Sequence, residues 1–158
     1  MSSTLQSVLT LTHVIISLIG IVTGLIVIFG FLKSTPPGAM NTTFLAFTIL
    51  TDITGYIFFP FHGITPGIKL GAISLMVLII AVIALRRKRT MTYIVAAIVA
   101  EFLNVFVGIV QSYEKIPALH KLAPTGKEAI VGITQLAVLV FFIVMAVWAI
   151  RKKAYVLA

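Results

Sequence analysis

The 158-residue sequence contains no cysteine, only four acidic residues and a single tryptophan. Without cysteine the chain can form no disulfide, no Cys-ligated zinc or iron–sulfur centre and no thiol nucleophile. Charged residues make up 10% of the chain and hydrophobic residues 60%, whereas ordinary soluble domains are about 25% charged and about 45–50% apolar. This composition excludes a soluble globular fold and predicts a membrane protein.

Five apolar segments fill most of the chain, and each meets or approaches the roughly 20 residues that a spanning helix needs. They cover residues 8–32, 42–61, 69–85, 91–113 and 129–150. The first segment lacks the basic leader of a secretory signal and exceeds its usual apolar length of about 7–15 residues, so we expect it to be retained. We therefore predict an all-α bundle of five transmembrane helices that forms one domain over residues 1–158.

Basic residues divide unequally between the two sides that five crossings would create. One side has eight, namely Lys33, Arg86, Arg87, Lys88, Arg89, Arg151, Lys152 and Lys153. The other side has four, namely Lys69, Lys115, Lys121 and Lys127. The positive-inside rule then predicts an external N-terminus and a cytoplasmic C-terminus. We expect the cluster at residues 86–89 to contact anionic lipid headgroups, and not nucleic acid, because so short a loop offers little surface for reading a groove.

The longest connection, residues 114–128, contains a candidate interfacial segment at about residues 116–123. Ile116, Leu119 and Leu122 recur at three-residue spacing, and Pro117 suits a first helical turn. The segment is either a lid over something beneath it or a plain amphipathic connector in the headgroups.

Polar side chains within the spans are few, and each should face protein or water, because a charge at mid-bilayer costs about 2.5–3.5 kcal/mol on insertion scales. We take them as candidate ligand- or proton-binding residues. They are His13, Asp52, Tyr56, His62, Glu101, Asn104, Gln111 and Gln135.

Helical spacing indicates which of these residues can meet. Glu101, Asn104 and Gln111 share one stripe of their helix, and Asp52 and His62 share one stripe of theirs. Gly20 and Gly24 form a small-xxx-small helix-packing contact. Counting ten residues back from His62 and from Gln111 places both carboxyls at one level, about 15 Å below the outer rim.

The inner half of the bundle is expected to be apolar, since residues 25–32, 75–85 and 136–150 contain no ionisable or amide side chain. A continuous aqueous pore would need polar lining on both sides. The pattern therefore predicts a polar pocket that is open outward and closed inward.

Two interpretations of Asp52 and Glu101 stay open. They could form a proton-coupled or cation-binding site, or they could be protonated carboxyls that tie helices together. A metal held by His13, Asp52 and Glu101 is chemically allowed, and His13 with His62 could ligate haem if their depths matched. Neither has a supporting motif, so metal and cofactor remain unknown.

Residues 58–67 (FFPFHGITPG) and 104–124 (NVFVGIVQSYEKIPALHKLAP) resemble segments of small bacterial inner-membrane proteins to which no activity is assigned. The resemblance implies a bacterial multi-spanning protein in which His62, Gln111 and the outer loop are signature positions. Size and five spans are also similar to the tryptophan-rich sensory family, but the multiple tryptophans of that family are absent here.

These patterns favour an outward-facing intramembrane pocket that binds a small cationic or hydrogen-bonding ligand in a proton-linked transport cycle. The first alternative is a membrane subunit or scaffold that packs against a partner or a second copy of the chain. The second is a haem- or metal-binding membrane protein. No catalytic motif points to an enzyme.

Overall fold

The computed structural model describes residues 3–33, 38–57 and 66–152, and all of its regular structure is helical. Its elements are α1 (Ser3–Leu32), α2 (Ala39–Tyr56), α4 (Pro66–Arg86), α5 (Thr90–Lys115), the short α6 (Pro117–His120) and α7 (Ala129–Arg151). No strand occurs in these ranges. The predicted all-α class is confirmed for the part of the chain that the structure describes.

Four of the helices, α1, α4, α5 and α7, are long and apolar enough to cross a membrane. The chain is therefore a multi-pass membrane protein. Helix α2 has only 18 residues and includes Asn41, five threonines and Asp52. Since α2 is not among the four, the predicted count of five crossings is confirmed only in part.

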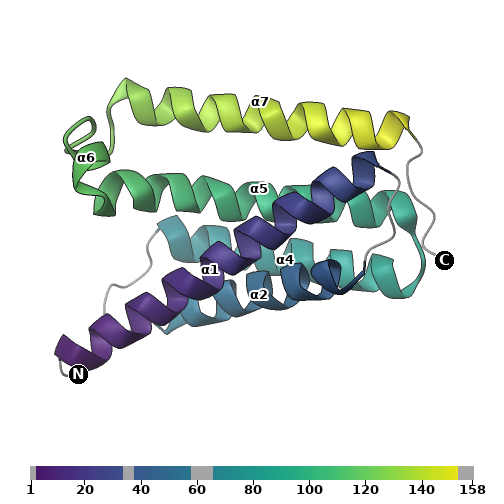
Figure 1. The fold of residues 1–158 in the computed structure, drawn as a ribbon, viewed down its shortest axis with the longest axis horizontal. Coiled ribbons are helices and arrows are strands. Elements are labelled where there is room, and N and C mark those ends of the chain that lie inside the picture. Colours follow the sequence, from purple (N-terminus) through teal and green to yellow (C-terminus); the bar gives the residue numbers. More distant parts are fainter. Residues whose placement is uncertain (1–2, 34–37, 58–65, 153–158) are drawn as a thin grey trace.

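Helix α5 occupies the middle of the bundle and packs against α1, α4 and α7, while α2 packs against α1 and α4. The chain reverses direction at each step from α1 through α2, α4 and α5 to α7, and α1 crosses the others obliquely (Figure 1). Tyr93, Ile94 and Ala97 of α5 are fully buried. Small residues such as Ala97 let neighbouring backbones approach closely, which suits helix packing in a membrane.

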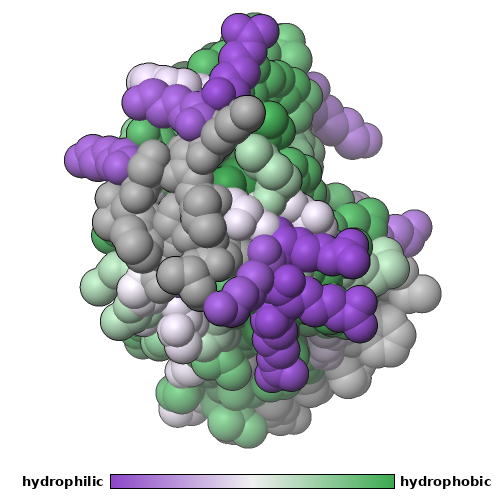
Figure 2. All heavy atoms as spheres, turned by 90° about the vertical axis from the view of Figure 1, so that its right-hand side faces the viewer, coloured by the Kyte–Doolittle hydropathy of each residue, from purple (hydrophilic) through white to green (hydrophobic). Residues whose placement is uncertain are grey.

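One end of the bundle, here called the basic end, gathers the C-terminal ends of α1, α4 and α7 and the start of α5 (Figure 1). Its hydrophilic side chains cluster on that face (Figure 2). The basic residues described there are Lys33, Arg86, Arg87, Lys88, Arg89, Arg151 and Lys152. Lys153 lies outside the described residues. The basic residues that charge counting assigned to one side thus lie together at one end of the bundle, and no acidic residue lies among those described there.

A tight turn joins α4 to α5 and presents four consecutive cations. Lys88 adopts a left-handed conformation with φ of 55°, and the backbone N–H of Arg89 donates to Ala84 O at 2.8 Å. Residues in this conformation commonly end helices. Lys152 Nζ donates to Leu32 O at 3.3 Å, which joins the ends of α7 and α1.

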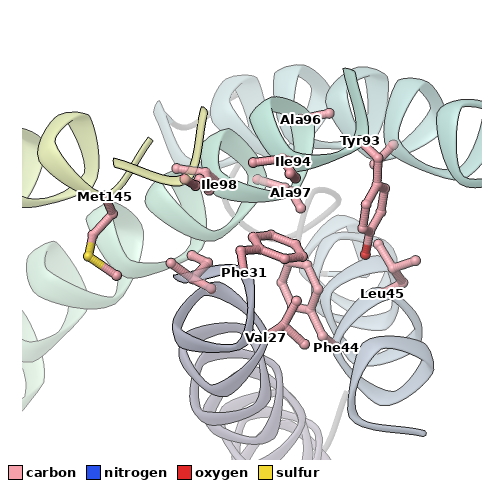
Figure 3. Close-up of a cluster of buried hydrophobic side chains, with 14 of the residues drawn as sticks. Val27, Phe31, Phe44, Leu45, Tyr93, Ile94, Ala96, Ala97, Ile98 and Met145 are labelled. Carbon is pink, nitrogen blue, oxygen red and sulfur yellow. The ribbon is translucent and has the colours of Figure 1, made fainter. Parts of the chain in front are cut away.

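The apolar core lies toward the basic end, where α1, α2 and α5 meet (Figure 3). Phe31 and Phe44 point toward each other beneath Ala97, and Phe31 makes an edge contact with Tyr93 at a centroid distance of 5.9 Å. Both phenylalanines are at most 1% exposed. We call these residues, with Ile28 and Ile94, the aromatic core.

The outward faces of α4 and α7 are exposed and apolar, as shown by Met76, Ile79, Ile133 and Leu136. In water such a surface would be an aggregation liability. In a bilayer it contacts lipid tails, which agrees with the lengths and compositions of these helices.

The predicted interfacial segment at 116–123 is shorter than expected, since α6 spans only four residues. Leu119 and Ala123 pack against Tyr113 and Val131, whereas Ile116 and Leu122 are exposed. One face of a single turn is enough to dock the connection. The three-residue spacing therefore does not mark one continuous buried stripe.

Candidate functional site

Gly20 and Gly24 of α1 mark the points where polar side chains of α2 and α5 approach the α1 backbone closely. A side-chain Cβ at Gly20 would lie 3.2 Å from Asn104 Nδ2 and 3.3 Å from Thr48 Oγ1. At Gly24 it would lie 2.1 Å from Glu101 Oε2 and 2.8 Å from a ring carbon of Phe44. The absence of side chains on this face therefore lets polar groups from α2 and α5 reach the α1 backbone.

Glu101 lies at the centre of this contact and is 0% exposed. Neither of its carboxyl oxygens has a hydrogen-bond partner among the described residues, and the same is true of Thr48 Oγ1 and Asn104 Nδ2. We call Glu101, Asn104 and Thr48, with Gly20 and Gly24, the Glu101 cluster. Buried polar atoms are almost always paired, so four unpaired atoms on one interface are unusual.

Asp52 belongs to a different interface, between α2 and α4. Its side chain is hydrogen-bonded by Ser74, and Oδ1 lies 3.9 Å from where a Cβ of Gly71 would be. Tyr56 OH also faces Gly71 and donates to Ile68 O at 3.3 Å. The second oxygen, Oδ2, is buried without a partner in the described part of the chain.

The two carboxyls do not share a level, contrary to the depth expected from residue counting. Glu101 lies beside Phe44 of α2, and Asp52 is eight residues further along that helix. At 1.5 Å per residue, the offset is about 12 Å. Glu101 is the nearer of the two to the aromatic core.

His13 of α1 contacts α2 in the last turn of α2. Its Nδ1 lies 2.8 Å from Thr54 Oγ1, and its ring approaches Gly55. The hydroxyl of Thr54 itself donates to Leu50 O at 2.7 Å. This bonding holds the imidazole between α1 and α2, away from the Glu101 cluster.

The remaining predicted site residues lie apart from this cluster. Gln111 is exposed, and its Nε2 donates to Glu114 Oε2 at 3.3 Å. Gln135 is half-buried on α7. His62 lies outside the described residues. The structure therefore brings together Glu101 and Asn104, and separately Asp52 and Tyr56.

Neither of two hollows on the described residues is lined by Asp52 or Glu101. A shallow one runs along a single face of α1, from Gln6 to Val14. The other lies between Thr12 and Thr54 and has a volume of about 30 Å³, which is room for about one water molecule. The predicted outward-open pocket thus has no counterpart in these two hollows.

The described residues contain no group of three histidine, aspartate or glutamate side chains placed to hold a metal ion. His13, Asp52 and Glu101 consequently do not form the metal site that their chemistry allowed. The haem pair includes His62, so it lies outside the described residues.

Two buried polar contacts involve residues that were not among the predicted site residues. Tyr93 OH donates to the buried Asn41 Oδ1 and bonds α5 to α2 at the basic end. Thr48 is fully buried beside Gly20. A signal existed for both, because Tyr93 lies two turns before Glu101 on one face of α5, and Thr48 lies one turn before Asp52.

Comparison with known proteins finds no family model, no curated protein and no solved structure that matches the chain.

Proposed function

We propose that the chain is an inner-membrane protein that binds a small cation or hydrogen-bonding ligand at an intramembrane polar site and links that binding to proton movement in a transport cycle. The observation that carries the proposal is the fully buried Glu101, whose two oxygens have no partner within the described residues. A carboxyl inside a membrane is a functional-site hypothesis by default, because a purely structural one would be paired.

The surroundings of Glu101 support access from the end opposite the basic end. Toward the basic end the interface is filled by Phe31, Phe44 and Ile94. Away from it, the same interface continues to Thr48 and Asn104, and Asp52 follows Thr48 by one turn of α2. In this proposal Glu101 and Asp52 carry the charge or the proton.

The other candidate residues take ligand-orienting roles in this proposal. They are His13, Tyr56, His62, Asn104, Gln111 and Gln135. The basic end faces the cytoplasm, with α2 as a fifth crossing and an external N-terminus, which follows from the positive-inside rule. The turn at residues 86–89 then contacts anionic headgroups.

The test is proton movement in reconstituted vesicles. Purified protein is placed in liposomes that contain a trapped pH-sensitive dye, and sodium, potassium or ethylammonium chloride is added outside. At least one salt should change the internal pH, and Glu101→Gln or Asp52→Asn should reduce the change to that of protein-free vesicles.

A matched control is Glu128→Gln, because Glu128 bonds to Thr125 in the turn before α7 and is not among the proposed binding residues. This variant should behave as wild type. The proposal fails if no salt changes the dye signal beyond that of empty vesicles, or if both carboxyl variants, folded and inserted, retain the wild-type signal.

A second candidate is a non-transporting membrane subunit. The observation that favours it is that Glu101 Oε2 occupies the space a side chain at Gly24 would fill, so the helices are tightly closed there. A silent vesicle assay together with co-purification of another membrane protein at fixed stoichiometry would support this alternative. A haem- or metal-binding role would show as a Soret band or one equivalent of metal.

A further inference from the structure

The Glu101 cluster gathers polar atoms along one turn of a helix interface, from Gly20 to Gly24 of α1. Both carboxyl oxygens of Glu101 and Thr48 Oγ1 are buried without a partner in the described residues. Asn104 adds an amide whose Nδ2 lies, like Thr48 Oγ1, within 3.3 Å of the point above Gly20. Rotation of the amide by half a turn would direct its oxygen there instead.

Glu101 is the one ionisable group of this cluster, so the cluster carries a single negative charge when the carboxyl is deprotonated. No salt bridge or hydrogen bond from a lysine or arginine reaches Glu101 among the described residues. The other intramembrane carboxyl, Asp52, lies about 12 Å further along α2 by helical rise and bonds to Ser74. One positive charge therefore neutralises the cluster.

The titratable groups on the neighbouring elements are distant. On α1 the nearest is His13, seven residues from Gly20 and bonded to Thr54. On α2 it is Asp52, and on α5 itself it is Tyr93, bonded to Asn41. On α4 and α7 the ionisable residues, Lys69, Arg86 and Arg151, lie in the first or last turn.

From this arrangement we propose that Glu101, Thr48 and Asn104 bind a partly or fully dehydrated monovalent hard cation of sodium type, in competition with a proton. Hard cations prefer carboxylate, hydroxyl and amide oxygens. A divalent ion would leave one charge uncompensated inside the membrane, which is costly. The inference rests on the proposed function and names its ligand.

Competition follows from the shared carboxylate. A proton on Glu101 removes the negative charge that attracts the ion, and a bound ion excludes the proton. Occupation of the site by one or the other supplies the link between cation binding and proton movement.

The experiment measures how fast dicyclohexylcarbodiimide modifies Glu101 in the detergent-solubilised full chain, followed by intact-mass and peptide mass spectrometry. The reagent attacks protonated carboxyls in apolar surroundings. At a sodium concentration about ten times the dissociation constant, modification should slow about tenfold, as mass action requires. Choline at the same ionic strength should not slow it.

Two matched variants locate the ion. Thr48→Val should abolish the protection by sodium while Glu101 is still modified. Thr51→Val, three residues further along α2, should retain the protection by sodium, because the Thr51 hydroxyl already donates to Phe47 O at 2.9 Å. Binding of radioactive sodium to wild-type protein should be lost in Glu101→Gln.

Equal modification rates in sodium and choline, or no adduct on Glu101 at any pH, would overturn the cation site. The two proposals can fail separately. Vesicles that move protons while sodium gives no protection would contradict the cation site and leave the proposed function standing. Protection by sodium in a protein that moves no protons would contradict the transport function and leave the cation site standing.

Discussion

The interface of α1, α2 and α5 has two halves that the same three helices build in opposite ways. Toward the basic end, Phe31, Phe44 and Tyr93 fill it, and its buried polar pair, Asn41 and Tyr93, is hydrogen-bonded. Toward the other end, glycines replace the aromatic rings, and Glu101 and Thr48 are buried with unpaired oxygens. Large rings close the first half, whereas missing side chains bring polar atoms together in the second.

We interpret the first half as stabilising the fold and the second half as serving function. A packed aromatic half with satisfied hydrogen bonds stabilises the bundle. Unpaired buried oxygens destabilise it, and proteins retain such local violations mainly at functional sites. We therefore expect the loss of a hydrogen bond in the aromatic half to destabilise the fold, and the loss of a polar group in the Glu101 cluster to change binding.

The largest loss of stability is expected for Gly24→Ala. The new methyl would meet Glu101 Oε2 at 2.1 Å and Phe44 at 2.8 Å, so the helices must move apart, at about 1–3 kcal/mol for overpacking. Gly30→Ala is the control, because nothing lies within 4 Å of its Cβ position. Thermal unfolding followed by circular dichroism in mild detergent should show a lower midpoint for Gly24→Ala only. Equal midpoints would mean that the glycine contact is unimportant.

A loss no larger than that is expected for Tyr93→Phe in the aromatic half. The substitution keeps the ring against Phe31 and leaves the buried Asn41 Oδ1 without its donor. An unsatisfied buried acceptor costs about 1–3 kcal/mol, which the same unfolding assay can measure. Vesicle proton movement should persist in this variant. Loss of that movement with stability unchanged would reverse the proposed division between the two halves.

The smallest expected effect is a pH-dependent change in the stability of one turn, which lies outside the membrane at the start of α7. The backbone N–H of Thr125 donates to Glu128 Oε1 at 3.0 Å and holds the pKa of Glu128 below its ordinary value. A lowered pKa stabilises the folded turn above the ordinary value of 4.5, and this contribution is lost as the pH falls through the lowered pKa. Hydrogen exchange at the Thr125 amide should accelerate on acidification in wild type. In Glu128→Gln the exchange, corrected for intrinsic pH effects, should stay constant, and a wild-type profile there would exclude Glu128 as the cause.

Much of the fold could be predicted, because long apolar runs and clustered cations are strong signals. The observed α4, α5 and α7 start and end within three residues of the predicted spans, and the basic residues described gather at one end. Helix α2 was harder, since its threonines and Asp52 lower its hydropathy while still facing neighbouring helices.

The site was only partly predictable. Stripes of residues indicate which side of a helix is polar, but not which neighbouring helix it meets. The shared level of Asp52 and Glu101 was inferred by counting from His62 and Gln111 as if both marked one rim. Gln111 is exposed next to Glu114, and Glu101 lies beside Phe44, eight residues before Asp52 on α2, so equal residue counts do not give equal depths.

The central claim, that the Glu101 carboxyl serves binding and not helix association, is tested most directly by the unfolding midpoint of Glu101→Met in sodium-free detergent. Methionine has a similar length and no polar oxygen. Replacing an unpaired buried carboxyl by an apolar side chain should raise the free energy of unfolding, by about 1–4 kcal/mol. A variant destabilised as much as Tyr93→Phe would show that Glu101 holds the helices together, and would contradict the account.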